Sequence, residues 1–328
     1  VLTKGLKRLE YRGYDSAGIA LYNGEKTNVY KCRGKVSDLE EFVKDKDTKG
    51  CIGIGHTRWA THGEPNDINA HPHVSMNGKF TLIHNGIIEN YASLKRTLEE
   101  KGYCFKGETD SEVLVNFIEY IYTDSLKKDD SFLPDDAVRE ALMLVEGAYG
   151  IVVLSEDDPE TITVARKGSP IVIGLGSGEY FVASDATPII EYTNSVIYLK
   201  DLDVATISNT GFNLSNLKDR RAKIDIQKVD LSIDEIEKNG FAHYMLKEIY
   251  EQPRAITDTY RGRLSFDSKN LTLGGLHTIM DQLKEAKRII IVACGTSWHA
   301  GLVGEYLFEE FARIPTEVEY ASEFRYRN

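Results

Sequence analysis

Cysteine is scarce in this sequence, and long hydrophobic runs are absent. The four cysteines among 328 residues, Cys32, Cys51, Cys104 and Cys294, lie far apart and form no CxxC pair. This spacing argues against a disulfide scaffold and favours a reducing, cytoplasmic location. The longest apolar run, residues 289–294, has the length of a buried strand, well short of the roughly 18 residues that cross a bilayer. We therefore expect neither a membrane-spanning segment nor a membrane partner.

Positive charge is also in short supply. Lys and Arg number 40 against 51 Asp and Glu, which gives a formal net charge of −11. No basic stripe offsets this balance, so the composition disfavours nucleic acid as a partner. With 41% hydrophobic and 28% charged residues, the composition is that of a globular protein. Because domains usually have about 100–200 residues, the length predicts two domains.

Both ends of the sequence resemble cuts in a longer chain. Residues 1–10 place Leu2, Leu6 and Leu9 on one face, as in an amphipathic helix already under way. The last residues stop without a turn or a cap. We therefore expect the sequence to be an internal piece of a larger protein.

Hydrophobic periodicity predicts strands, then helices, then strands again in the first two thirds of the chain. The Asn23-Gly24 pair between two alternating runs is typical of a hairpin turn. The expected strands are 16–22, 27–33, 51–56, 79–84, 150–154, 161–165, 170–174, 179–183 and 203–207, and the expected helices are 90–100, 111–123 and 135–145. This order predicts an α+β fold with packed antiparallel sheets and helices on their outer faces.

The rest of the sequence predicts a second, incomplete domain. Residues 217–239 are charged, lack aromatic residues and show little periodicity, so we expect a linker there. Beyond it we expect helices at 243–252, 274–286 and 297–312, a buried strand at 288–294 and a strand at 316–320. A strand, a helix and a further strand begin a parallel α/β sheet. The predicted domains are thus 1–216 and 240–328.

The segment from Gly55 to Gly63 carries the first candidate site residues. Arg58 and Trp59 lie there among threonines and histidines, between a strand and a turn that contains proline. A guanidinium binds a planar carboxylate through two parallel hydrogen bonds, so the loop suits an acidic ligand. The alternative is a surface loop with a solvated arginine and a tryptophan that packs on a sheet edge.

Five of the eight histidines fall between His56 and His84, which invites a metal site as an interpretation. No HExxH motif or Cys/His cluster accompanies them, and His71-Pro72-His73 lacks the spacing of structural zinc ligands. The sequence therefore argues against a bound metal.

Three further segments each allow two interpretations. Asn85-Gly86, after an apolar strand, is either a turn or an oxyanion hole, in which amide N–H groups stabilise developing negative charge. Asp110 either caps the expected helix that follows it or binds a substrate ammonium. In the second domain, Thr296 and Ser297 follow a buried strand. Ser297 is either a plain N-cap or part of a phosphate site at a helix N-terminus.

Longer motifs run through both predicted domains. The first domain contains, in this order, residues 9–19 (LEYRGYDSAGI), 56–65 (HTRWATHGEP), 69–73 (NAHPH), 84–90 (HNGIIEN) and 109–112 (TDSE). The second contains 243–253 (HYMLKEIYEQP), 293–297 (ACGTS) and 321–327 (ASEFRYR). Together they resemble the glutamine–fructose-6-phosphate aminotransferase (isomerizing) family, and the resemblance covers the whole sequence.

This resemblance implies a fold and a reaction. The first domain is implied to be a four-layer αββα sandwich of the N-terminal-nucleophile amidotransferases, and the second to be the beginning of an α/β SIS-type sugar-isomerase domain. The implied enzyme transfers the amide nitrogen of glutamine to fructose 6-phosphate and forms glucosamine 6-phosphate and glutamate. No metal or redox cofactor is implied. The resemblance does imply a homodimer formed through the isomerase half.

The resemblance also implies a glutamine pocket. Arg58 matches the arginine that binds the α-carboxylate of glutamine, and Asp110 matches the acid that pairs with its α-ammonium. Thr61, His62 and His71 match residues of the surrounding pocket.

Catalytic and neighbouring residues follow from the same resemblance. Asn85 and Gly86 match the oxyanion hole, and Gly86 also borders the bound glutamine. Trp59 matches the indole that gates the passage of ammonia between the domains. The remaining matches are Arg12 and Asp15, which support the nucleophile, and Thr296 and Ser297, on one side of the sugar-phosphate cradle.

The family's nucleophile is a cysteine at the mature N-terminus, whose own α-amine acts as general base. All four cysteines of this sequence are internal, so none can take that role. We expect the parent protein to be an enzyme and residues 1–328 alone to be inactive. One alternative is a non-catalytic sugar-phosphate-sensing homologue that has lost the nucleophile. Another is an amidotransferase similar to amidophosphoribosyltransferase, which shares the fold.

Overall fold

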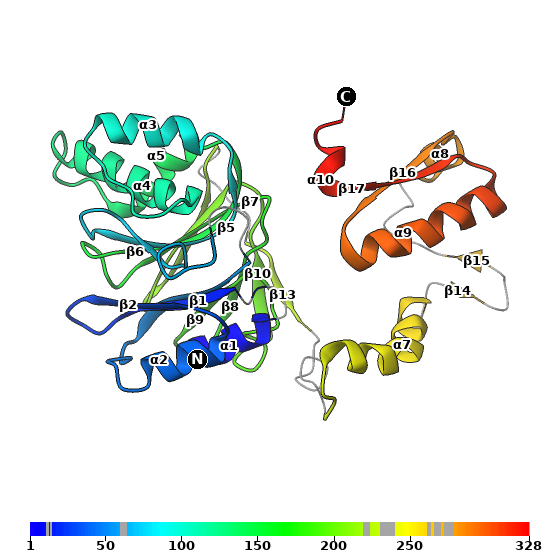
Figure 1. The fold of residues 1–328 in the computed structure, drawn as a ribbon, viewed down its shortest axis with the longest axis horizontal. Helices are drawn as coiled ribbons and strands as arrows, with labels where there is room; N and C mark the ends of the chain where they lie inside the picture. The colour runs from blue at the N-terminus through cyan, green and yellow to red at the C-terminus, as the bar shows by residue number, and fades with distance from the viewer. Residues whose placement is uncertain are drawn as a thin grey trace. The chain divides into compact units, whose positions relative to one another are not determined.

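The chain folds into two units, residues 1–239 and 240–328, and each is described by itself. The computed structural model describes residues 1–10, 13, 15–59, 64–218, 224–229, 240–260, 264–265, 270–271 and 279–327. In the first unit, two inner layers of sheet are covered on both outer faces by helices (Figure 1). This is the αββα order predicted for the first domain.

One inner layer is a six-stranded antiparallel sheet with the order β12-β11-β7-β6-β5-β4. Its strands are β4(His73–Val74), β5(Phe80–Ile88), β6(Gly147–Ser155), β7(Ile162–Lys167), β11(Asp203–Ser208) and β12(Gly211–Asn216). β5 extends beyond its expected end, and its partners on β6 place Asn85 opposite Gly150 and Gly86 opposite Tyr149. The turn interpretation of Asn85-Gly86 is therefore wrong, because the pair lies within a strand.

The other inner layer contains two shorter antiparallel sheets. One has the order β2-β1-β3, and the other β13-β10-β8-β9. Their strands are β1(Ser16–Tyr22), β2(Thr27–Arg33), β3(Ile52–Arg58), β8(Val172–Leu175), β9(Tyr180–Ala183), β10(Ser195–Tyr198) and β13(Ile226–Lys228). The predicted hairpin around Asn23-Gly24 is confirmed, with Gly24 at a positive φ of 100°. β13 lies in the expected linker, so this part of 217–239 is folded with the first unit.

Among the described residues of the first unit, five helices form the outer layers. They are α1(Leu2–Leu9) and α2(Val36–Val43) on one side, and α3(Tyr91–Glu100), α4(Asp110–Leu126) and α5(Pro134–Leu144) on the other. Leu114 and Ile118 of α4 are fully buried, in one cluster with Leu82 of β5. Each such side chain contributes about 1.5–3 kcal/mol when it leaves water. This packing fixes the start of α4 beside β5, where the candidate site lies.

The second unit is built around a parallel strand pair, as predicted. Its elements are α7(Tyr244–Tyr260), β14(Leu264–Ser265), β15(Asn270–Leu271), α8(Met280–Lys284), β16(Ile289–Ala293), α9(Gly295–Leu307), the π-helical turn η3(Phe308–Ala312), β17(Thr316–Tyr320) and α10(Ala321–Phe324). Gly301 of α9 packs against Ile291 and Val318, which covers one face of the pair. Ile290 and Val292 are 39% and 40% exposed. The prediction of a buried strand is therefore wrong for this face, which the described residues leave open.

None of the described helices combines the length and the apolar character that a bilayer crossing requires.

Candidate active site

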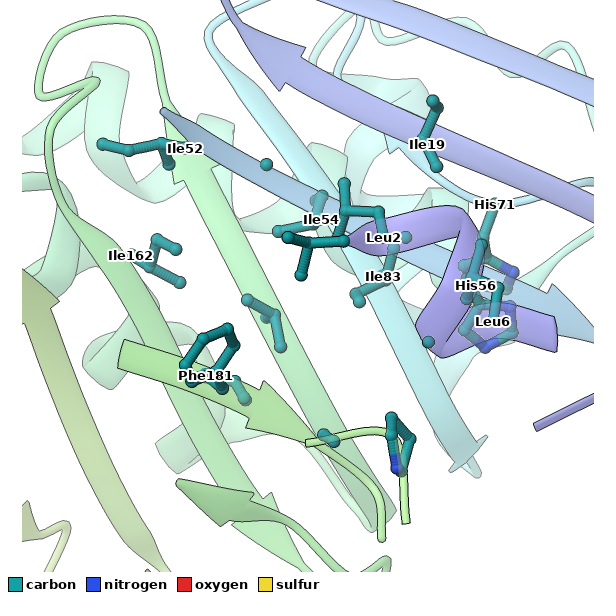
Figure 2. A pocket seen from close by; sticks show the side chains of 18 of the residues that line it. Leu2, Leu6, Ile19, Ile52, Ile54, His56, His71, Ile83, Ile162 and Phe181 are labelled. Carbon is teal, nitrogen blue, oxygen red and sulfur yellow. The ribbon is translucent and has the colours of Figure 1, made fainter. Parts of the chain in front are cut away.

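A cavity of about 1410 Å³ lies within the first unit. Figure 2 shows Leu2 and Leu6 of α1, Ile54 of β3 and Ile83 of β5 around it, with His56 and His71 close together near Leu6. Within the described residues, β3 and β9 are each the edge strand of their sheet, and both contribute to the lining. The cavity brings together six predicted site residues, namely Arg58, Trp59, His71, Asn85, Gly86 and Asp110.

Arg58 is the last residue of β3, and its side chain is only 5% exposed. Its Nη1 donates a hydrogen bond to the carbonyl oxygen of Glu64 at 3.3 Å. Burial lowers the pKa of the Arg58 guanidinium, and the carboxylates of Asp15 and Asp110 counteract this effect. The cavity thus contains a buried cation that can bind a carboxylate through two hydrogen bonds.

Asp110 is the first residue of α4, and it is 6% exposed. The N-cap is Thr109, whose hydroxyl accepts the backbone N–H of Glu112 at 3.2 Å, so the prediction that Asp110 caps this helix is wrong. The Asp110 carboxylate instead accepts the backbone N–H of Ile88 at 2.8 Å, across from β5. A carboxylate held in this way can bind an ammonium group that enters the cavity.

Asn85 and Gly86 lie on β5 and line the same cavity as Arg58 and Asp110. Gly86 has a φ of +138°, and a Cβ at this position would lie 2.1 Å from the carbonyl oxygen of Ala148. Only glycine fits such a site. The Oδ1 atom of Asn85 lies 2.9 Å from Nε2 of His56. An exposed amide beside a glycine N–H is the arrangement that stabilises an oxyanion.

The end of the cavity that contains Arg58, Asn85 and Asp110 is its polar end, and the buried imidazoles of His56, His71 and His84 line the cavity there. A fourth buried imidazole, that of His73, packs against His71. Sequence reasoning did not identify His56, His73 and His84 as site neighbours. The ring centroids of His56 and His71 are 4.2 Å apart, and those of His71 and His73 are 4.7 Å apart. His84 Nδ1 lies 2.9 Å from the hydroxyl of Ser111. Burial lowers the pKa of all four, to about 4 for His56.

These imidazoles are therefore neutral at pH 7. Within the part of the chain that the structure describes, no group of His, Cys, Asp and Glu side chains is arranged to hold a metal ion. The signal that could have identified His56 is its place at an inward-facing position of β3, where burial alternates along the strand.

The structure places the other predicted residues as follows. Trp59 lines the cavity and is 58% exposed. Asp15 lies beside the end of β3, where its backbone N–H donates to the carbonyl oxygen of Arg58 at 3.0 Å. Arg12, Thr61 and His62 lie outside the described residues.

In the second unit, Thr296 and Ser297 are exposed in the first turn of α9. The N-cap residue is Cys294, so the prediction of Ser297 as an N-cap is wrong. Backbone N–H groups at the start of a helix bind anions, and two hydroxyls there can add to such a site.

Cys51 also lines the cavity, but it is far from Asn85. It precedes β3, and at about 3.3 Å per residue it lies about 16 Å from His56, the partner of Asn85. Cys32, Cys104 and Cys294 do not line the cavity.

Known domain families match both units of the chain. The glutamine amidotransferase domain family matches residues 27–131, and the SIS domain family matches residues 282–328. Curated glutamine–fructose-6-phosphate aminotransferases (isomerizing) from Chlorobaculum tepidum and Bacteroides thetaiotaomicron are 54% and 55% identical over 331 residues. These alignments cover 100% of this chain and 53% of each relative. The chain thus spans about half the length of these relatives.

Solved structures share the fold. One, titled as the allosteric regulatory enzyme of purine biosynthesis, has a TM-score of 0.56 and 28% identity, and the match covers 66% of this chain and 46% of that one. The glutamine phosphoribosylpyrophosphate amidotransferase of B. subtilis has a TM-score of 0.56 at 22% identity, with 96% of this chain and 62% of that one covered. The second likeness supports the fold alone.

The αββα unit and the matched domains define the class, a glutamine amidotransferase with the N-terminal-nucleophile fold joined in one chain to SIS-domain sequence. Within this class, the sequence identity of 54% and 55% over the whole chain indicates the family. The chain belongs to the glutamine–fructose-6-phosphate aminotransferase (isomerizing) family.

Proposed function

We propose that the polar end of the cavity binds glutamine. We further propose that the complete protein transfers the amide nitrogen of glutamine to fructose 6-phosphate, with glucosamine 6-phosphate and glutamate as products. The observation that carries this proposal is the placement of Arg58 and Asp110 in one cavity with Asn85 and Gly86, because both charged side chains are almost fully buried. The head group of an α-amino acid carries one charge of each sign, so it complements a guanidinium and a carboxylate that line one cavity.

Recognition of glutamine follows from these charges. Arg58 binds the α-carboxylate through its planar guanidinium, and Asp110 binds the α-ammonium. Thr61, His62 and His71 complete the pocket around the substrate. This arrangement directs the side-chain amide of glutamine toward Asn85 and Gly86.

Amide cleavage then needs a thiolate. Its sulfur attacks the amide carbon, and the negative charge that develops on the oxygen is stabilised by the Asn85 amide N–H and the Gly86 backbone N–H. The carbon–nitrogen bond breaks, the leaving nitrogen takes up a proton from the general base, and ammonia departs past Trp59. Water cleaves the resulting thioester to glutamate and restores the thiol. Arg12 and Asp15 support the nucleophile's surroundings.

We propose that this thiol belongs to an N-terminal cysteine that precedes residue 1 in the natural protein. Its own α-amine accepts the thiol proton, as in other nucleophiles of this type. Cys51 lies about 16 Å along its strand from His56, the partner of Asn85, and the other three cysteines do not line the cavity. Among the described residues, β3 is an edge strand that lines the cavity, so an added segment could pair with it there.

The second half of the reaction is assigned to the SIS region. Thr296 and Ser297, at the start of α9, bind the phosphate of fructose 6-phosphate with the backbone N–H groups of that turn. We also propose a cytoplasmic homodimer formed through the isomerase half.

Two other functions fit the first unit less well. An amidotransferase similar to amidophosphoribosyltransferase would share the fold, but the SIS match at residues 282–328 favours a sugar-phosphate acceptor. A non-catalytic sugar-phosphate sensor would retain the glutamine pocket without a cysteine before residue 1. The upstream codons of the gene decide between this sensor and the enzyme.

The experiment that tests this proposal is Arg58→Lys in the complete protein. A lysine ammonium cannot replace the two-pronged guanidinium, so the KM for glutamine should rise about 100-fold, the equivalent of losing a charged hydrogen bond. Isomerisation of the sugar phosphate without glutamine serves as the internal control and should be retained. An equal loss of both activities would show that Arg58 is structural and would contradict the proposal.

A further inference from the structure

The hydrogen bond between His56 and Asn85 connects the two sheet layers of the first unit at the cavity. His56 lies on β3, Asn85 lies on β5, and the distance between Nε2 and Oδ1 is 2.9 Å. The proposed reaction uses Asn85 in the oxyanion hole but gives His56 no role. The contact allows His56 to influence the orientation of the Asn85 amide.

An asparagine side chain can face an oxyanion in two ways. Its oxygen and nitrogen are related by a flip of the amide, and only the nitrogen side donates hydrogen bonds. If Oδ1 faced the developing oxyanion, the two negative oxygens would repel each other. The contribution of Asn85 to catalysis therefore depends on what holds Oδ1 on the opposite side.

His56 can hold it there. An N–H on Nε2 of the ring donates to Oδ1 of Asn85 and leaves the amide nitrogen directed away from the ring. The other tautomer would present a lone pair at Nε2 and favour the flipped amide. Which tautomer forms is thus coupled directly to the orientation of Asn85.

The surroundings keep the ring of His56 in place. The ring is buried and packs against His71 with centroids 4.2 Å apart and planes inclined by 37°. Burial lowers the pKa of His56 to about 4, although its bond to Asn85 acts in the opposite direction. The ring is therefore neutral at pH 7 and carries a single N–H, which Asn85 Oδ1 can accept.

We propose that His56 is a positioning residue for the glutaminase reaction: its Nε2–H fixes the Asn85 side chain so that the amide N–H points at the oxyanion. This inference rests on the proposed function, because it presupposes the oxyanion hole at Asn85 and Gly86. It adds a residue that acts through Asn85 and touches neither substrate nor thiol.

The main test compares three substitutions in the complete protein. His56→Leu removes the donor and should lower the glutaminase kcat about 10- to 100-fold, somewhat less than deletion of an oxyanion donor itself. The KM for glutamine should change less than threefold, because the orientation of Asn85 matters in the transition state. His56→Gln should restore most of kcat, since its amide nitrogen can occupy the place of Nε2. His56→Asn is the matched control, and its shorter side chain should not restore the rate.

A double-mutant cycle tests whether His56 acts through Asn85. In an Asn85→Ala background, His56→Leu should cause no further loss of kcat, because the group that it orients is gone. Additive losses, a rise in KM with unchanged kcat, or a Gln variant as slow as the Leu variant would each overturn the inference. An unchanged kcat in Asn85→Ala would overturn the oxyanion hole of the proposed function, and the inference with it. A slow Asn85→Ala together with a fast His56→Leu would overturn the inference alone.

A spectroscopic measurement covers the case in which His56→Leu fails to fold. In protein labelled with ¹⁵N at histidine, the ring shifts of His56 should report the Nε2–H tautomer at pH 7, and Asn85→Ala should perturb them. The Nδ1–H tautomer would contradict the proposed role.

Discussion

The two units support their candidate sites in different ways. In the first, Arg58 and Asp110 are almost fully buried, and their partners come from separate segments of the chain. In the second, Thr296 and Ser297 are exposed in the first turn of one helix. The comparison indicates that the first site depends on long-range packing, whereas the second depends on a local helix terminus. Substitutions in the first site should therefore have the larger effects.

The two units also differ in how many hydrophobic side chains they bury. Among the described residues, every buried hydrophobic side chain lies in the first unit, from Leu6 to Leu214. In the second unit, α9 exposes large apolar side chains, for example Val303 and Tyr306. The first unit thus offers a rigid support on which buried charged groups can be held.

The largest effect should come from the N-terminal cysteine that we propose as the nucleophile. A cavity with substrate-binding groups but no thiol beside Asn85 and Gly86 retains only a small part of the catalytic rate. We therefore expect residues 1–328 to show no measurable glutaminase activity, measured as glutamate release. A chain extended to begin with Cys-Gly should be active.

The control for this prediction is the same extended chain with that cysteine changed to alanine, which should be inactive. Turnover by residues 1–328, with nothing gained from the cysteine, would contradict the assignment of the nucleophile.

Gly86→Ala should have the next largest effect. A Cβ there would collide with the carbonyl oxygen of Ala148 and would occupy a positive φ, so β5 must shift away from the oxyanion position. Loss of this donor should lower the glutaminase kcat about 100-fold or more. Gly78→Ala is the matched control, since it also has a positive φ, of 79°, but open space around it. A Gly86→Ala variant as active as Gly78→Ala would remove Gly86 from the site.

Acid should destabilise the first unit before the second. Burial lowers the pKa of His56, His71, His73 and His84 in the folded state, whereas the unfolded chain binds protons near pH 6.5. Their contribution is fully present above pH 6.5 and is lost as the pH falls through each folded-state pKa, which is about 4 for His56. Each histidine adds a slope of up to about 1.4 kcal/mol per pH unit.

Hydrogen exchange measured by mass spectrometry between pH 7 and pH 5 resolves the two units. The free energy of opening should fall for the first unit and stay nearly constant for the second, whose described histidines, His243 and His299, are exposed. A flat profile for the first unit would show that the four imidazoles are not held neutral.

The smallest effect is expected in the second unit. Ser297→Ala removes one exposed hydroxyl from the turn at the start of α9, while the backbone N–H groups of that turn remain. The KM for fructose 6-phosphate should rise about five- to tenfold, which corresponds to roughly 1 kcal/mol for a solvated hydrogen bond. Hydrolysis of glutamine should be unaffected. A loss as large as that of Gly86→Ala would contradict the contrast between the two sites.

Local sequence signals predicted the elements that depend on local interactions. The hairpin at Asn23-Gly24, the helix α4 and the parallel pair of β16 and β17 all follow from turn chemistry or periodicity. The strands β10 and β12 and the helix α2 were not predicted, because they are short and their hydrophobic patterns are weak without neighbours.

The candidate site was predicted in part. Motifs identified Arg58, Asn85 and Asp110, which the structure brings to one cavity. The partnership of His56 with Asn85 could not be predicted, because it depends on where two segments meet in three dimensions. The capping role of Thr109 is local, since its hydroxyl accepts the backbone N–H of Glu112 three residues on. The spacing of Thr109 and Glu112 is that of a capping box and could have indicated this role.

The most direct test of the glutamine site is a crystal structure of the complete protein with L-glutamate, the proposed product. The α-carboxylate should lie within hydrogen-bond distance of the Arg58 guanidinium, and the α-ammonium should lie beside the Asp110 carboxylate. One oxygen of the side-chain carboxylate should face the Asn85 amide nitrogen and the Gly86 N–H. Glutamate bound in the reverse orientation, or outside this cavity, would contradict the account.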